Sequence, residues 1–211
     1  MDKADLVKVV GWRLGDREDM ADRIDLELDI LQDTVLEAKP WHPWFLESEL
    51  AYASTFPNER RVPLPVDFLG ELEESHLYLV EPTTLQQKEL VKKDADVGLR
   101  TFPYIGTPIA YAISGLYFQF FPKPDDAYPI AMRYYAKDVR ISSATADSRW
   151  MKYAPDIVLA ELCLALASKH IKDPEAAQGF AQDAQVAWKR LYDKHVAMAE
   201  INQPRSLGGN T

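Results

Sequence analysis

The four histidines are the residues of this chain best suited to metal chemistry, but their spacing does not form a ligand set. They are His42, His76, His170 and His195. No pair has the His-Glu-x-x-His spacing that places two imidazoles on one helix face, and a single cysteine is too few for a cysteine-rich zinc site. We interpret the histidines as exposed or partly buried polar residues, and we expect no metal and no other cofactor.

Carboxylates are abundant, and a pair of them could form the acid and base of a glycosidase. The candidates are Glu71, Glu73 and Glu74 near a predicted strand, and Asp125 and Asp126 in a predicted loop. A general acid needs a pKa raised by an apolar pocket, which abundance alone does not indicate. The pattern therefore favours solvated surface groups.

Nucleophiles and phosphate-binding loops are equally weak signals. No serine stands in a Gly-x-Ser-x-Gly elbow, and the Ile-Gly-Thr-Pro segment at 105–108 lacks the lysine and the spacing of a phosphate loop. Cys163 lies in the most apolar predicted helix, which is typical of a small core residue and not of a nucleophile. We therefore expect no catalytic residue.

Aromatic residues form two clusters. Trp41-His42-Pro43-Trp44-Phe45 is either a corner that packs the middle of the chain onto a helical body or an aromatic anchor at a protein interface. Phe118, Phe120 and Phe121 are either the core of a sheet or a surface covered by a neighbouring subunit.

The composition limits the classes of function. The chain has 211 residues, a formal net charge of −9 and one cysteine. A negative charge repels phosphates, which argues against a protein that reads DNA but not against one that lines a channel through which DNA slides. One cysteine excludes an intrachain disulfide. With no apolar run at the N-terminus and no stretch of about 18 apolar residues, we expect a soluble protein made in a reducing cytoplasm.

Helical periodicity occupies the two ends of the chain. It predicts helices over 3–14 and 16–38, separated at Gly15, with Asp16 as the N-cap of the second helix. Residues 150–171 are apolar nearly all round, which is typical of a central buried helix. Asp173-Pro174 predicts the start of a last helix that continues to about Ile201.

The middle of the chain has the alternation of strands. Apolar residues alternate with others on both sides of Ser114-Gly115, which predicts a hairpin, and we expect a short helix around 83–92. The predicted fold is α+β, with a four-helix body made from residues 1–40 and 150–203. A β-rich insertion, a sandwich or small barrel, occupies 44–142, and a flexible C-terminal tail occupies 204–211.

Four segments, in this order, resemble a known family. The first is Leu14-Gly15-Asp16-Arg17, and the second is Leu64-Pro65-Val66-Asp67-Phe68. The third begins with Tyr111-Ala112-Ile113-Ser114-Gly115 and continues through Pro122-Lys123-Pro124 to Tyr134-Tyr135. The fourth is Trp150-Met151 followed by Pro155-Asp156. Together they make the chain similar to the head–tail adaptors, or connectors, of tailed phages, which attach beneath the portal.

The resemblance implies a structural virion protein and not an enzyme. It implies a ring of twelve copies that binds the portal, bridges it to tail or nozzle proteins and keeps a channel open for double-stranded DNA, without sequence recognition. It also implies that C-terminal segments reach into the portal. In residues 204–211, Arg205 and Leu207 are best able to contribute, by charge-assisted hydrogen bonds and by burial.

The second predicted helix has an acidic face. Its members are Asp22, Asp25, Asp29 and Asp33. We expect this face to be solvated and, in a ring, to face the channel, where it would reduce the adhesion of passing DNA.

Two other functions stay open. One is a peptidoglycan hydrolase associated with the phage tail, which a buried carboxylate in a sugar-sized cleft would favour. Some adaptors of this type have been linked to cell-wall hydrolysis, but no motif here matches a catalytic residue. The other is a tail-completion protein of similar shape, which subunit number and nearest neighbour would separate from an adaptor.

Overall fold

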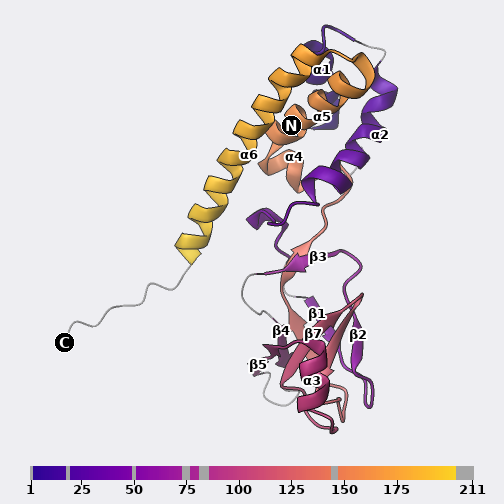
Figure 1. The fold of residues 1–211 in the computed structure, drawn as a ribbon, viewed down its shortest axis with the longest axis vertical. Coiled ribbons are helices and arrows are strands. Elements are labelled where there is room, and N and C mark those ends of the chain that lie inside the picture. Colours follow the sequence, from indigo (N-terminus) through magenta and orange to yellow (C-terminus); the bar gives the residue numbers. More distant parts are fainter. Residues whose placement is uncertain are drawn as a thin grey trace, which may run out of the picture. The chain divides into compact units, whose positions relative to one another are not determined.

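The computed structural model describes residues 2–17, 20–48, 51–72, 77–80, 86–143 and 147–202. The chain divides into two compact units (Figure 1). Unit 1 is made from both ends of the chain, Met1–Leu46 and Asp138–Thr211, and unit 2 is the intervening segment Glu47–Lys137. Helices predominate in unit 1 and strands in unit 2, so the mixed α+β class predicted from the sequence is confirmed.

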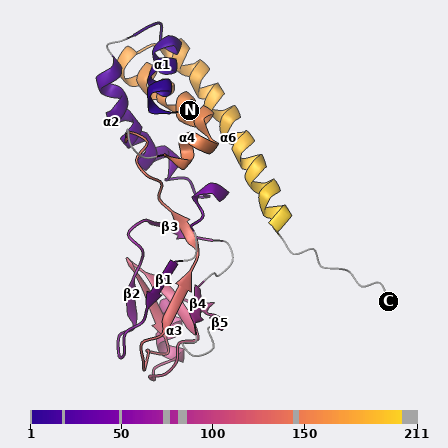
Figure 2. The ribbon, with the colours of Figure 1, turned by 180° about the vertical axis from the view of Figure 1, so that it is seen from behind.

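Unit 1 is arranged around helix α5 (Pro155–Leu166), which is apolar on nearly every side. It contacts α1 (Lys3–Arg13), α2 (Ala21–Leu31) and α6 (Pro174–Asn202). Figures 1 and 2 both show α2 and α6 on opposite sides of this unit. Large side chains that are almost fully buried in the unit include Leu6, Ile24, Leu28, Trp150, Ile157 and Leu162.

The break after α1 is a Schellman cap. Gly15 has φ +80°, and its N–H donates to the Trp12 carbonyl over 3.2 Å. The N–H of Asp16 donates to the Gly11 carbonyl over 2.9 Å, which is the second bond of this motif. Asp16 itself has φ +57°. Its predicted role as the N-cap of the second helix is therefore wrong, because it closes α1 while α2 begins only at Ala21.

Two π-helical turns extend helices of unit 1. The turn η2 (Gln32–Leu36) continues α2, and η4 (Ala167–Ile171) continues α5. In η2 the Glu37 N–H donates to the Gln32 carbonyl over 3.0 Å, five residues back. A π turn places side chains five residues apart on one face, and such turns are frequent at functional positions.

The predicted helix over 150–171 is interrupted. Helix α4 (Arg149–Tyr153) ends at Ala154, which has φ −141° and ψ 47°, and α5 starts at Pro155. A residue before proline is disfavoured in the helical region, which explains the interruption. The start of α6 is as predicted, since Oδ1 of Asp173 accepts from the N–H groups of Glu175 and Ala176 over 3.1 and 3.0 Å.

Unit 2 contains three small sheets among its described residues. Their strand orders are β1-β9-β4-β5, β2-β8-β7-β6 and β10-β3, and only β6 and β7 pair in parallel. The strands are β1 (Ala51–Ser54), β2 (Arg61–Pro63), β3 (Phe68–Glu71), β4 (Leu77–Val80), β5 (Gln87–Glu89), β6 (Val91–Lys92), β7 (Ala110–Ser114), β8 (Tyr117–Phe121), β9 (Pro129–Met132) and β10 (Tyr134–Ala136).

The predicted hairpin is confirmed. Strands β7 and β8 pair antiparallel, from Ala110 opposite Phe121 to Ser114 opposite Tyr117. Gly115 makes the turn with φ +61°, a conformation that glycine adopts without steric cost. Phe118 and Phe120 then lie in the hydrophobic core of the unit, so they are sheet-core residues.

One short helix, α3 (Ala95–Thr101), covers part of a sheet in unit 2. Asp94 caps its N-terminus by accepting from the N–H groups of Asp96 and Val97. The helix expected around 83–92 is wrong in the described part of that range, where residues 87–89 and 91–92 form β5 and β6. The helix lies a few residues later because Asp94 provides the capping side chain.

Candidate functional site

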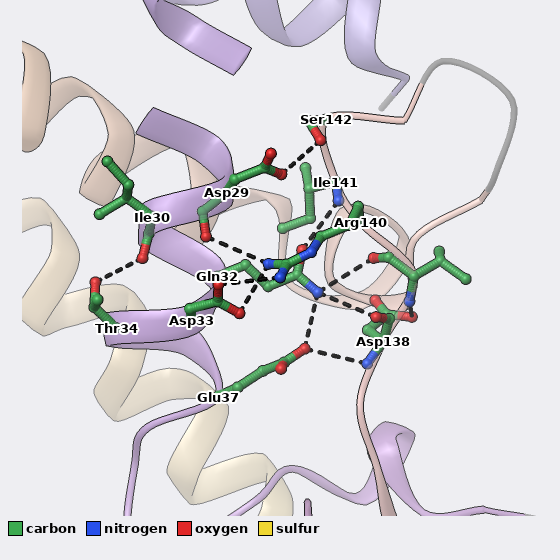
Figure 3. Close-up of polar contacts among 11 residues, drawn as sticks. Asp29, Ile30, Gln32, Asp33, Thr34, Glu37, Asp138, Arg140, Ile141 and Ser142 are labelled. Atoms are coloured by element: carbon green, nitrogen blue, oxygen red, sulfur yellow. Dashed lines mark hydrogen bonds and ion pairs between the residues drawn. The ribbon is translucent and has the colours of Figure 1, made fainter. Parts of the chain in front are cut away.

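A cluster of polar contacts in unit 1 joins α2 and η2 to the segment 138–142 (Figure 3). Its centre is Gln32, which is 1% exposed. Nε2 of Gln32 donates to Oε1 of Glu37 over 2.8 Å and lies 3.2 Å from the Asp138 carbonyl, while Oε1 accepts from the Ile141 N–H over 3.1 Å. The π turn makes this possible because it brings Gln32 and Glu37 onto one face.

Asp138 anchors the other end of this cluster. Its side chain is 2% exposed. Oδ2 accepts from the Ser148 hydroxyl over 2.7 Å and from the Trp150 N–H over 3.0 Å, and Oδ1 accepts from Nε of Arg149 over 3.2 Å. These bonds tie residue 138, where the chain enters unit 1 for the second time, to the start of α4.

The described acids of the predicted acidic face of α2 are bound by other groups of the same chain. Asp25 pairs with Nζ of Lys3 over 2.8 Å, Asp29 accepts from the Ser142 hydroxyl over 2.6 Å, and Asp33 binds both guanidinium nitrogens of Arg140 over 2.8 and 3.0 Å. The side chain of Asp22 lies outside the described residues. Asp25 and Asp33 remain about half exposed. Their orientation towards a channel stays a prediction.

A buried carboxylate that sequence reasoning missed is Glu27, which is 4% exposed. It accepts from Nζ of Lys169 over 2.7 Å and lies 2.9 Å from Nε2 of His170, both on η4. Burial by itself raises the pKa of Glu27, but the hydrogen bonds from Lys169 and His170, together with the charge of Lys169, outweigh burial and lower it. A catalytic general acid needs the opposite shift.

His170 and His195 contact neighbouring side chains of unit 1. Nδ1 of His170 lies 2.7 Å from Arg23, and because a guanidinium only donates, this nitrogen accepts and Nε2 donates to Glu27. His195 stacks on Trp41 at 5.4 Å. Burial lowers the pKa of His42, and His76 lies outside the described residues. In the described ranges, no three His, Cys, Asp or Glu side chains gather to hold a metal ion.

The other predicted candidates are also held by neighbours. Glu71 pairs with Lys92 and accepts from the Tyr111 hydroxyl over 2.8 Å, and Asp125 accepts from the Tyr128 hydroxyl over 2.7 Å. Glu73 and Glu74 lie outside the described residues. Cys163 is buried, and burial raises the pKa of its thiol to about 12, so the thiolate is suppressed.

The aromatic cluster at 41–45 packs within unit 1. Trp41 meets Trp188 and Tyr192 of α6 at 5.9 and 5.3 Å. Phe45 meets Trp150 of α4 at 5.1 Å. The rings therefore attach the end of the first chain segment to α4 and α6 within unit 1. The two hypotheses for this cluster, a corner between the middle of the chain and the helical body or an anchor at a protein interface, stay predictions.

An apolar groove of about 350 Å³ lies beside α1. Its lining residues are Val7, Lys8, Gly11, Trp12, Asp16, Arg17 and Ile24. Trp12 is largely exposed, and the ammonium of Lys8 lies 5.2 Å from its ring. Among the described lining residues Asp16 is the one carboxylate, whereas glycoside hydrolysis uses two.

Comparison with known protein families agrees with the resemblance that the four motifs carry. A family model described as SU10 adaptor protein matches residues 1–209. The chain therefore belongs to the SU10 adaptor protein family, a family of phage head–tail adaptors. Its role is that of a structural virion protein that interacts with other virion proteins. No curated protein matches the chain.

Two expectations from the sequence concern other parts of the chain. Arg205 and Leu207, the side chains expected to bind the portal, lie outside the described residues. Among the helices that the structure describes, none is long and apolar enough to cross a membrane.

Proposed function

We propose that this adaptor assembles into a ring of twelve copies beneath the portal, bridges the portal to tail or nozzle proteins and keeps the DNA channel continuous. The observation that carries the proposal is the family match over residues 1–209, which covers both units. Assembly of this kind works through interfaces between subunits, and the described buried carboxylates Glu27, Glu37 and Asp138 are hydrogen-bonded within the subunit.

The surface of the isolated chain supports assembly. Large apolar side chains that are more than half exposed occur in both units. In unit 1 they include Trp12 and Leu26, and in unit 2 they include Tyr52, Phe56, Val66, Tyr104 and Leu116. Larger contiguous apolar patches on a protein surface mark sites of interaction, and neighbouring subunits and virion proteins would cover such side chains.

The charge of the chain supports passage of DNA without binding. A net charge of −9 per copy would be multiplied in a ring, and the resulting field opposes adhesion of phosphates. Contacts with DNA in the channel are therefore expected to be transient and independent of sequence.

The C-terminal segment is proposed as the part that binds the portal. The proposal rests on the sequence, where Arg205 offers charge-assisted hydrogen bonds and Leu207 an apolar side chain beyond the end of α6 at Asn202.

Peptidoglycan hydrolysis is not supported by the buried carboxylates. Glu27 has a lowered pKa, Glu37 accepts from Gln32 and from the Asp138 N–H, and Asp138 accepts from three groups near α4. The lowered pKa of Glu27 is the opposite of the shift that a general acid needs.

Electron microscopy of the purified protein, alone and mixed with the portal protein of the same phage, tests the proposal. We expect closed rings or a symmetric second tier on the portal, with twelve copies by rotational averaging. A protein that stays monomeric and never decorates the portal would show that the adaptor ring is wrong. Another copy number would correct the stoichiometry alone.

A further inference from the structure

We infer that neighbouring copies in the ring pack through the outer face of α2 on one copy and the outer face of α6 on the next. The inference rests on the proposed function for the existence of a ring. It adds the pair of surfaces that forms the subunit contact and the residues at its centre, Leu26 and Val186.

A ring of identical subunits needs two different surfaces on opposite sides of each copy. A head-to-tail contact joins surface A of one copy to surface B of the next, and the rotation closes the ring. In unit 1, α5 contacts both α2 and α6, and these two helices lie on opposite sides of the unit (Figures 1 and 2). Their outer faces are therefore placed as a ring requires.

The outer face of α2 is apolar where a solvated helix would be polar. Ile24, Leu28 and Leu31 face the core of unit 1 and are buried. On the opposite side, Leu26 is 62% exposed, and Ile30, one turn later, is also exposed. A leucine and an isoleucine four residues apart form one stripe on a helix surface. The stripe lies among carboxylates, since Asp29 and Asp33 follow Leu26 by three and seven residues.

The outer face of α6 has the complementary pattern. Ala184 and Leu191 face α5 and are buried, whereas Val186 on the other side is 50% exposed. Lys189 and Arg190 follow Val186 by three and four residues, and both are exposed. Within the described part of the chain, neither cation forms an ion pair in its own subunit.

The exposed faces of α2 and α6 match in helix direction as well as in charge. Helices α2 and α6 run in the same direction in Figure 1, so α6 of a copy related by rotation about the ring axis runs parallel to α2. With Leu26 opposite Val186, Asp29 of α2 and both bases of α6 lie about one turn further along, and Asp33 lies about two turns further along. Asp29 and Asp33 already accept from Ser142 and Arg140 of their own subunit. A carboxylate can accept further hydrogen bonds, so a cation of the next copy that joins these pairs would fix the register of the contact.

This subunit contact and the channel-facing role predicted for the acids of α2 are alternatives. A face that packs against the next copy is removed from the channel. The two assignments differ in what lies within reach of Leu26, which cross-linking measures directly.

The native cysteine does not interfere with such an experiment. Cys163 is buried, and burial raises the pKa of its thiol to about 12. Cysteines placed at exposed positions therefore react selectively. We would combine Leu26→Cys with Val186→Cys in the full chain, assemble the protein on the portal of the same phage and add a short bismaleimide.

The inference predicts a ladder of adaptor multimers from the double variant, up to the closed ring, with the linkage between positions 26 and 186 identified by mass spectrometry. Each single variant should remain uncross-linked, because a head-to-tail contact does not bring like positions together. Val66→Cys combined with Val186→Cys is the matched control, since Val66 is fully exposed in unit 2. It should give no ladder.

The failures of the inference and of the proposed function are distinguishable. Rings that are visible by electron microscopy but give no linkage between positions 26 and 186 would overturn the inference and leave the ring intact. Dimers of the single Leu26→Cys variant, or a linkage from position 26 to the portal, would assign the face to another occupant and overturn it as well. Absence of rings from the unmodified protein would remove both.

A second pair of variants tests the contact without cross-linking. Leu26→Glu should reduce ring formation at least tenfold, because a third acid beside Asp29 and Asp33 replaces the central apolar contact. Val66→Glu adds the same charge elsewhere and should assemble normally. Equal assembly of the two variants, both with unchanged melting, would contradict the inference.

Discussion

The hydroxyl of Tyr134 donates a hydrogen bond to Oδ1 of Asp67 over 2.8 Å and joins two segments that are 67 residues apart in the chain. The ring of Tyr134 also stacks on Phe68 with centroids 5.6 Å apart. Both segments carry the resemblance to phage adaptors, and strands β3 and β10 pair beside this contact. The two motifs therefore meet in one small sheet, which the tyrosine–aspartate pair holds together.

Removal of this hydroxyl should weaken unit 2. Burial and then Asp67 raise the pKa of Tyr134 to about 12, so the hydroxyl remains a donor at all ordinary pH values. Tyr134→Phe should lower the free energy of unfolding by about 1 kcal/mol, measured by chemical denaturation. Tyr52→Phe, at a largely exposed tyrosine, should have no effect. Equal stability of the two variants would mean that the pair does not hold the sheet.

Gln32 should be sensitive to loss of its amide. Gln32→Leu preserves the volume of a buried side chain but removes one of two donors to Glu37 and leaves the Ile141 N–H without its acceptor. We expect a loss of roughly 2–4 kcal/mol in unfolding free energy. Asp33→Asn, which weakens an ion pair that is about half exposed, should cost less than about 1 kcal/mol. The reverse ranking in urea titrations would contradict the role assigned to η2.

Glu27 should make stability depend on pH. Its pKa in the folded protein is below the ordinary value of 4.5. Its contribution is therefore complete above the unfolded-state pKa and is lost as the pH falls through the folded-state pKa. Glu27→Gln should be less stable by about 2 kcal/mol at neutral pH, with a difference that shrinks in acid. A difference independent of pH would show that charge is not the cause.

Two glycines in helices should respond oppositely to alanine. A Cβ at Gly98 of α3 would lie 2.4 Å from the ring of Phe121, which is fully buried and has little room to move. Gly98→Ala should destabilise unit 2 by about 1–3 kcal/mol. Gly179→Ala in α6, where a Cβ meets nothing within 4 Å, should stabilise by up to about 1 kcal/mol. Thermal melting gives both signs, and a stable Gly98→Ala would refute the close approach.

Truncation tests the proposed portal contact. A chain that ends at Gln203 retains every described element, since α6 ends at Asn202. We expect unchanged melting but weaker binding to the portal in a surface-immobilised assay. Arg205→Ala combined with Leu207→Ala should reproduce the loss. Equal affinity of the full and shortened chains would exclude a docking role and leave the ring unaffected.

The sequence predicted the features that depend on local rules. The turn at Gly115, the break at Gly15 and the cap at Asp173 each follow from one residue with a strong conformational preference. The assignment of Asp16 failed because an aspartate that precedes a helix can also close the one before it. Pro155 was a usable signal for the gap between α4 and α5.

The polar cluster around Gln32 could not be predicted in the same way. Its partners lie on a segment more than 100 residues away, as the Gln32–Ile141 bond shows. The π turns that align Gln32 with Glu37 and that carry Lys169 towards Glu27 have no sequence signature comparable to a helix cap. The sequence predicted a solvated face of aspartates on α2. In the structure Asp25, Asp29 and Asp33 are paired, because Lys3, Ser142 and Arg140 reach them through the tertiary fold.

The order of synthesis has a consequence for an inserted unit 2. Helices α1 and α2 leave the ribosome first, but α5, on which both pack, is made only after the whole of Glu47–Lys137. At a rate of synthesis of about 5–20 residues per second, the apolar sides of α1 and α2 remain without α5 for on the order of ten seconds. During that interval the nascent chain exposes apolar surface of the kind that is prone to aggregation before folding is complete.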